Sequence, residues 1–162
     1  MKTIFFGTLH GGHTPHKDLE EILSDIKPDQ IFVELTKDEV ENMDDGKSIR
    51  DEMIFIWKWA EKNNIIVDHF DINSGGLKEG VTGKELGFKK LVDQMSVELE
   101  KYSWKELNKK EPWQTSPLLD IQNEIEDKFY DQEKFHNRDM AMLSNINNKI
   151  ISDGVVVVFT GT

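Results

Sequence analysis

Histidines gather in one short segment of the chain, which reads His10-Gly11-Gly12-His13-Thr14-Pro15-His16. The glycines and Pro15 prevent one continuous helix, so these imidazoles are expected on a loop that leads into a helix. Neutral imidazole binds zinc, manganese-like and iron ions when carboxylates complete the ligand set. His10 and His13 are therefore candidate metal ligands. The alternative for each is an imidazole that simply faces water.

A glutamate stands inside the apolar segment 30–35, in the order Val33-Glu34-Leu35. Burying a carboxylate among apolar side chains is costly unless the charge is paired. Glu34 is therefore expected either to cap the end of this segment or to have a functional partner, as a metal ligand or a general base. Asp71 follows the third apolar segment, where capping a loop is the alternative to function.

Four apolar segments surround these candidates, and each has the length and composition of a buried strand: 3–9, 30–35, 65–70 and 155–160. Segments with helical spacing separate the first three, which is the βαβ pattern of a parallel sheet. Ligands of such sheets bind outside the carboxyl ends of the strands. We therefore expect an α/β fold with a mainly parallel sheet flanked by helices, and with His10, Glu34 and Asp71 near one edge.

The helices have recognisable boundaries and one long insertion. Thr14 is expected to cap the first helix with Pro15 at its first position. A glycine-rich stretch, 73–83, is expected to be a mobile loop, and helical spacing then runs through 86–99 and through 118–151. The sequence thus predicts a single domain, 1–162, in which residues 73–135 are a mainly helical insertion before the last strand.

Composition excludes several classes of function. The 162 residues include 31 acidic and 20 basic side chains, a net charge of −11, which argues against binding to nucleic acid. The absence of cysteine excludes disulfides, thiolate catalysis and cysteine-based zinc sites. No apolar run approaches the ~18 residues of a membrane span. The expectation is a cytoplasmic protein that binds neither nucleic acid nor membrane.

Several segments together resemble the TraB/PrgY family and its TIKI relatives, in a superfamily with erythromycin-esterase-like and ChaN-like haem-binding proteins. The first strand ends in Gly7-Thr8-Leu9-His10, which matches the family's G-x-x-H. The second segment, 27–35, matches its "kPD-hydrophobic-VEL" pattern. The family's arginine element is matched by 138–142, and its closing strand by 155–162. The resemblance spans nearly the whole chain and is strongest at both ends.

The resemblance implies a divalent metal ion held by the histidines of two G-x-x-H motifs. It assigns Glu34 as base or ligand, Arg138 as the group that polarises a carbonyl, and Gly7 and Gly161 as turn glycines. The pattern stops at Gly161-Thr162, two residues before the position of the second histidine. Of the metal ligands, only His10 and Glu34 carry over, and catalytic zinc sites usually have three protein ligands.

Two functions follow as expectations. The first is a metal-dependent hydrolase of peptide or ester bonds, in a complete or truncated form. The second is a non-catalytic binding or regulatory module that sequesters a peptide or a metal-bearing, haem-like ligand in the same cleft. Either function implies a peptide or small-molecule partner.

Overall fold

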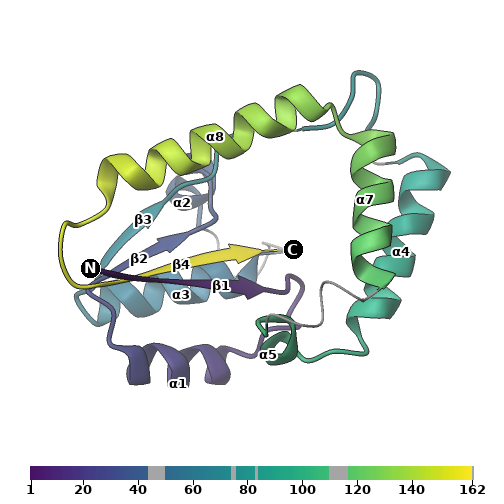
Figure 1. The fold of residues 1–162 in the computed structure, drawn as a ribbon. Helices are drawn as coiled ribbons and strands as arrows, with labels where there is room; N and C mark the ends of the chain where they lie inside the picture. Colours follow the sequence, from purple (N-terminus) through teal and green to yellow (C-terminus); the bar gives the residue numbers. More distant parts are fainter. Residues whose placement is uncertain (44–49, 74–75, 83, 110–116, 162) are drawn as a thin grey trace. The chain divides into compact units, whose positions relative to one another are not determined.

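A computed structural model of the chain describes residues 1–43, 50–73, 76–82, 84–109 and 117–161. Four parallel strands form one sheet in the order β1-β4-β2-β3, and helices flank it, which confirms the predicted α/β fold (Figure 1). The chain divides into two compact units. The first comprises Met1–Asn73 with Ala141–Thr162, and the second comprises Ser74–Met140.

All strands of the sheet belong to the first unit: β1 Lys2–Thr8, β2 Gln30–Val33, β3 Ile66–His69 and β4 Val155–Gly161. Because every pairing is parallel, the carboxyl ends of all four strands meet at one edge. This confirms the predicted edge. We call it the rim, meaning the strand ends together with the residues that follow them.

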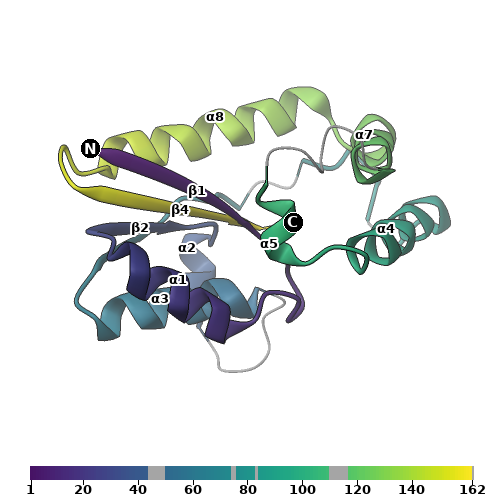
Figure 2. The same cartoon turned by 60° about the horizontal axis from the view of Figure 1, so that its bottom comes forward.

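Helices cover both faces of this sheet, α1 (His16–Ile26) and α3 (Asp51–Lys62) on one and the later part of α8 (Gln132–Lys149) on the other (Figures 1 and 2). Strand residues alternate between the faces. Phe32, Val156 and Val158 pack with Ile146 of α8. Their neighbours in the strands face the other layer and are fully buried: Ile31, Val33, Val157 and Phe159. A short helix, α2 (Lys37–Glu41), follows β2.

The first strand is less buried than the sequence predicts. A strand covered on both faces was expected at 3–9, but β1 lies at the edge of the sheet and Phe5 is 65% exposed. Phe6, on the opposite face, stacks on Phe159 with ring centroids 5.6 Å apart. Uniformly apolar letters cannot distinguish an edge strand from a central one, because the neighbours of each strand come from elsewhere in the chain.

The predicted helix cap at Thr14 is wrong. Pro15 is the N-cap of α1, and no side chain caps this helix end. The Thr14 hydroxyl instead accepts a hydrogen bond from the Leu9 amide at 2.7 Å and donates to the Leu9 carbonyl at 3.1 Å. Thr14 therefore closes the loop between β1 and α1 rather than starting the helix.

A buried glutamine fastens the end of α8 to the sheet. The Gln30 side-chain amide donates to Asp68 Oδ2 and to the Lys149 carbonyl, each at 3.0 Å, and its oxygen accepts from the Ile151 amide at 2.9 Å. Carbonyls at the end of a helix lack partners within the helix. Gln30 supplies one from β2, so α8 ends at a defined place above the sheet.

The second unit is helical, with α4 (Leu86–Leu99), α5 (Trp104–Leu107), α7 (Pro117–Phe129) and the first part of α8. The region predicted as one helical stretch, 118–151, is two helices, because the chain turns at Asp131, whose side chain accepts from the amides of Glu133 and Lys134. Of the glycine-rich stretch, residues 74–75 and 83 lie outside the described residues, as does Pro112. No helix among the described residues has the length and hydropathy of a membrane-spanning segment.

We predict that Gly154→Ala destabilises the protein strongly. Gly154 has φ +105°, and an added Cβ would lie 2.5 Å from Asp29 Oδ2, the atom that accepts from the Val155 amide at the start of β4. The expected loss in the free energy of unfolding is about 2–4 kcal/mol, from backbone strain plus the clash. Urea unfolding measures it.

Gly12→Ala is the matched control, since Gly12 also has a positive φ, +84°, but nothing lies within 4 Å of an added Cβ. It carries only the backbone cost, about 1–2 kcal/mol. Equal losses for the two variants would contradict the contact with Asp29.

Candidate functional site

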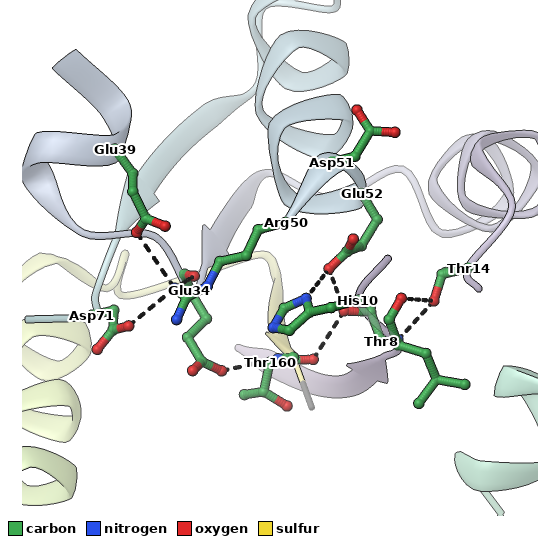
Figure 3. Close-up of polar contacts among 12 residues, drawn as sticks. Thr8, His10, Thr14, Glu34, Glu39, Arg50, Asp51, Glu52, Asp71 and Thr160 are labelled. Atoms are coloured by element: carbon green, nitrogen blue, oxygen red, sulfur yellow. Dashed lines mark hydrogen bonds and ion pairs between the residues drawn. The ribbon is translucent and has the colours of Figure 1, made fainter. Parts of the chain in front are cut away.

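His10 and Glu52 form a close pair at the rim. Nδ1 of His10, two residues past β1, lies 2.5 Å from Glu52 Oε1 in the first turn of α3 (Figure 3). Glu52 is only 1% exposed, and Thr8 also donates to its Oε1 at 3.4 Å. Because a carboxylate only accepts hydrogen bonds, Nδ1 carries the proton of the contact. Nε2 is then the ring atom left for chemistry when the imidazole is neutral.

The last residue of β4 lies against the His10 ring. A Cβ on Gly161 would lie 2.0 Å from Cε1 and 2.4 Å from Nε2 of that imidazole, so only glycine fits here. The Gly161 amide donates to Glu34 Oε2 at 2.9 Å. Gly161 therefore contacts both side chains that the sequence singled out, His10 and Glu34.

Arg50 joins three further parts of the rim. Its Nη1 donates to the Glu34 carbonyl at 2.6 Å and to Asp71 Oδ2 at 3.1 Å, and it lies 3.4 Å from Glu39 Oε2 in α2 (Figure 3). Asp71 is nearly fully buried, and its other oxygen accepts from the Ile72 amide. Arg50 therefore compensates the charge of a buried carboxylate while it holds the end of β2.

A second histidine of the same loop also pairs with α3. His16 Nε2 lies 2.9 Å from Asp51 Oδ2, and its ring stacks on Phe55 with centroids 4.3 Å apart. His13, by contrast, is exposed. The two histidines that contact α3 thus fix both ends of the loop, and His13 lies between them on the surface.

The structure brings together only part of the predicted site. His10, Glu34 and Gly161 meet at the rim. Gly7 is not in a turn, because it lies within β1 opposite Thr160, and the positive φ values of this region belong to Gly11 and Gly12. Arg138 lies on α8 in the second unit, so it is not among the residues that the first unit assembles.

Sequence reasoning missed Glu52 and Arg50, although both carry a signal. Glu52 precedes Ile56 and Ala60 at intervals of four, so it lies on the buried side of α3. A carboxylate is almost never buried there unless its charge is paired. Arg50 stands at the N-terminus of α3, where the helix dipole disfavours a positive charge. Each residue is therefore in a place that helix formation alone does not explain.

The donors at the rim bear on the metal ion that the family resemblance implies. The imidazole of His10 and the carboxylate of Glu34 are chemically suitable ligands for zinc or manganese. Among the described residues, however, no group of three or more histidines, aspartates and glutamates is placed to hold a metal ion. The described part of the rim therefore falls short of the three protein ligands of a typical catalytic zinc site.

His69 lies at the end of β3, and burial is the main cause that lowers its pKa, with the positive charge of Lys149 as the second cause. Its Nδ1 is buried and has no hydrogen-bond partner within the described residues. Protonation of this ring is therefore disfavoured in the folded protein.

The chain matches no protein-family model, no curated protein and no solved structure. The resemblance to the TraB/PrgY family thus rests on the motifs of the sequence alone. Function has to be argued from the geometry of the rim.

We predict that Gly161→Ala expels the His10 ring from its place beside Glu52, because the added methyl group would overlap the imidazole. Imidazole ¹⁵N chemical shifts, measured by NMR, should lose the pattern of an Nδ1 that donates to a carboxylate. Gly12→Ala, in the same region but with open space at Cβ, should preserve it. An unchanged His10 spectrum in Gly161→Ala would contradict the observed packing.

We further predict that His69 makes stability depend on pH. Its pKa is lowered in the folded state, so below the ordinary value of about 6.5 the unfolded chain takes up a proton that the folded protein resists. Stability from this source is complete above that value and is lost as pH falls below it. The urea midpoint of His69→Gln should therefore fall less between pH 7.5 and pH 5.5 than that of the unmodified protein. An equal fall in the two proteins would contradict the prediction.

Proposed function

We propose that this protein is a hydrolase of peptide or ester bonds in which His10, held by Glu52, activates water. The observation that carries the proposal is the 2.5 Å contact between Nδ1 of His10 and a carboxylate that is 1% exposed, at the sheet edge where ligands of parallel sheets bind. A histidine oriented through Nδ1 by a buried carboxylate presents Nε2 as a general base. The class of bond comes from the resemblance to the TraB/PrgY family.

The reaction follows from the hydrogen bonds of the pair. Nε2 takes a proton from water as the oxygen attacks the substrate carbonyl, and the charge that develops on the imidazole is balanced by Glu52. The tetrahedral intermediate then expels an alcohol or amine, which receives the proton from Nε2. The products are a carboxylic acid and the protonated leaving group, and the imidazole returns to its neutral form.

Glu34 has a separate role in this proposal. Its carboxylate accepts a hydrogen bond from the Gly161 amide, and the same glycine lies against the His10 imidazole. We assign it to orienting the attacking water, which a carboxylate does by accepting one of the water's hydrogen bonds.

A metal-dependent form of the reaction is part of the same proposal but rests on the resemblance. It requires at least one ligand beyond His10 and Glu34, and the described residues do not supply it. For this reason no step above passes through a metal ion. Zinc, manganese and a chelator belong in the assays so that this form is tested directly.

We predict that His10→Ala lowers kcat/KM for ester or peptide substrates by about 100-fold or more, because it removes the general base. Glu52→Gln should lower it to a similar degree, since a neutral amide cannot balance the imidazolium. His136→Ala is the control: it removes an exposed histidine of α8 in the second unit and should change the rate less than twofold. Rates with 4-nitrophenyl esters and a peptide library, each with and without metal, measure these effects.

Equal rates for His10→Ala and His136→Ala would overturn the proposal. Absence of hydrolysis in the unmodified protein under every metal condition would also overturn it and favour the binding module. A rate that appears only with added metal and disappears with chelator would support the metal-dependent form. Thermal melting of each variant separates loss of chemistry from loss of fold.

A further inference from the structure

We infer that Arg50 is the positioning residue that places the Glu34 carboxylate at the site. Arg50 binds the Glu34 main-chain carbonyl, which leaves the Gly161 amide to bind the Glu34 carboxylate. The inference concerns three groups only: the Arg50 guanidinium, the main chain and side chain of Glu34, and the Gly161 amide. The effect on catalysis rests on the hydrolase function proposed above. The choice of acceptor for the Gly161 amide does not depend on that function.

The regular hydrogen-bond ladder of parallel strands identifies the unusual contact. In such a ladder both main-chain groups of one residue bond the same neighbouring strand, to positions two residues apart. The Glu34 amide donates to the Phe159 carbonyl at 3.1 Å. The ladder therefore calls for the Gly161 amide, two residues farther along β4, to donate to the Glu34 carbonyl.

The structure shows a different pairing. The Gly161 amide donates at 2.9 Å to Oε2 of the Glu34 side chain, and the Glu34 carbonyl accepts from Arg50 Nη1 at 2.6 Å. The carboxylate has taken the place of its own residue's carbonyl in the ladder. Arg50 supplies the donor for the carbonyl, and the Gly161 amide supplies one for the carboxylate.

Other contacts hold Arg50 in this position. Its guanidinium contacts Asp71, which is nearly fully buried, and Glu39, whose carboxylate also caps α2 through Thr36. A charge-assisted donor fixed by two carboxylates competes well with a main-chain amide for one carbonyl. Without it, the Gly161 amide is expected to return to the carbonyl, which would release the Glu34 side chain from the site.

The experiment detects the acceptor of the Gly161 amide directly. Scalar couplings across hydrogen bonds, measured by NMR on isotopically labelled protein, connect an amide nitrogen to the carbon that bears its acceptor. In the unmodified protein the Gly161 nitrogen should correlate with the Glu34 side-chain carboxylate carbon. Loss of this correlation on removal of Arg50 supports the inference, and its persistence overturns the inference.

The variants are chosen so that the protein can fold. Arg50→Ala alone would leave the buried Asp71 charge without this partner, which destabilises proteins strongly. The double variant Arg50→Ala/Asp71→Asn removes both charges together, and Asp71→Asn alone should keep the Gly161 correlation. Lys37→Ala, which removes an exposed positive charge on α2, is the control for charge alone and should also keep it.

Kinetics test the consequence for catalysis. In the double variant kcat should fall about 10- to 100-fold, as expected for a misplaced water-orienting group, with KM changed less than threefold. A rise in KM at constant kcat would overturn the positioning role. If the unmodified protein hydrolyses nothing, the proposed function fails, but the Gly161 correlation still decides whether Arg50 places the Glu34 carboxylate.

Discussion

The burial of the Glu52 charge is the constraint on which the rim depends. A carboxylate that is 1% exposed needs partners, and His10 and Thr8 supply them from the end of β1. Both partners contact one oxygen, Oε1, while Oε2 is buried without a hydrogen bond from the described residues. Both contacts therefore fall on Oε1, and the imidazole makes the shorter of the two. The Glu52 carboxylate loses its hydration on folding, and its contact with Nδ1 holds the His10 imidazole in a fixed orientation.

Glu52 is the last of three consecutive charged residues whose side chains contact the loops of the rim. Arg50 reaches the segments after β2 and β3, Asp51 reaches His16 at the start of α1, and Glu52 reaches His10 after β1. Successive residues of a helix start point in different directions, so three neighbours in sequence can serve three different loops. The first turn of α3 thus positions groups that are far apart in the chain.

The features that the sequence predicted are those that depend on local pattern. Apolar segments and their spacing indicated the parallel sheet, and the sheet in turn placed His10 and Glu34 at one edge. The features that it missed depend on contacts between distant segments. The partner of His10 is 42 residues away in the chain, and the fit of Gly161 against the imidazole involves residues from opposite ends of the sequence. Similarly, the residues of segment 3–9 do not indicate that β1 lies at an edge of the sheet, next to β4.

The strand order has a consequence for how the molecule acquires its structure. β4 lies between β1 and β2, although it is the last of the four strands to be synthesised. Until residues 155–161 are available, β1 has no neighbour in the sheet and β2 can pair only with β3. Closing the sheet therefore waits for contacts of very large sequence separation, which is the kind of topology that folds slowly. Gly161 belongs to that strand, so His10 and Glu34 acquire their shared neighbour only when β4 has joined the sheet.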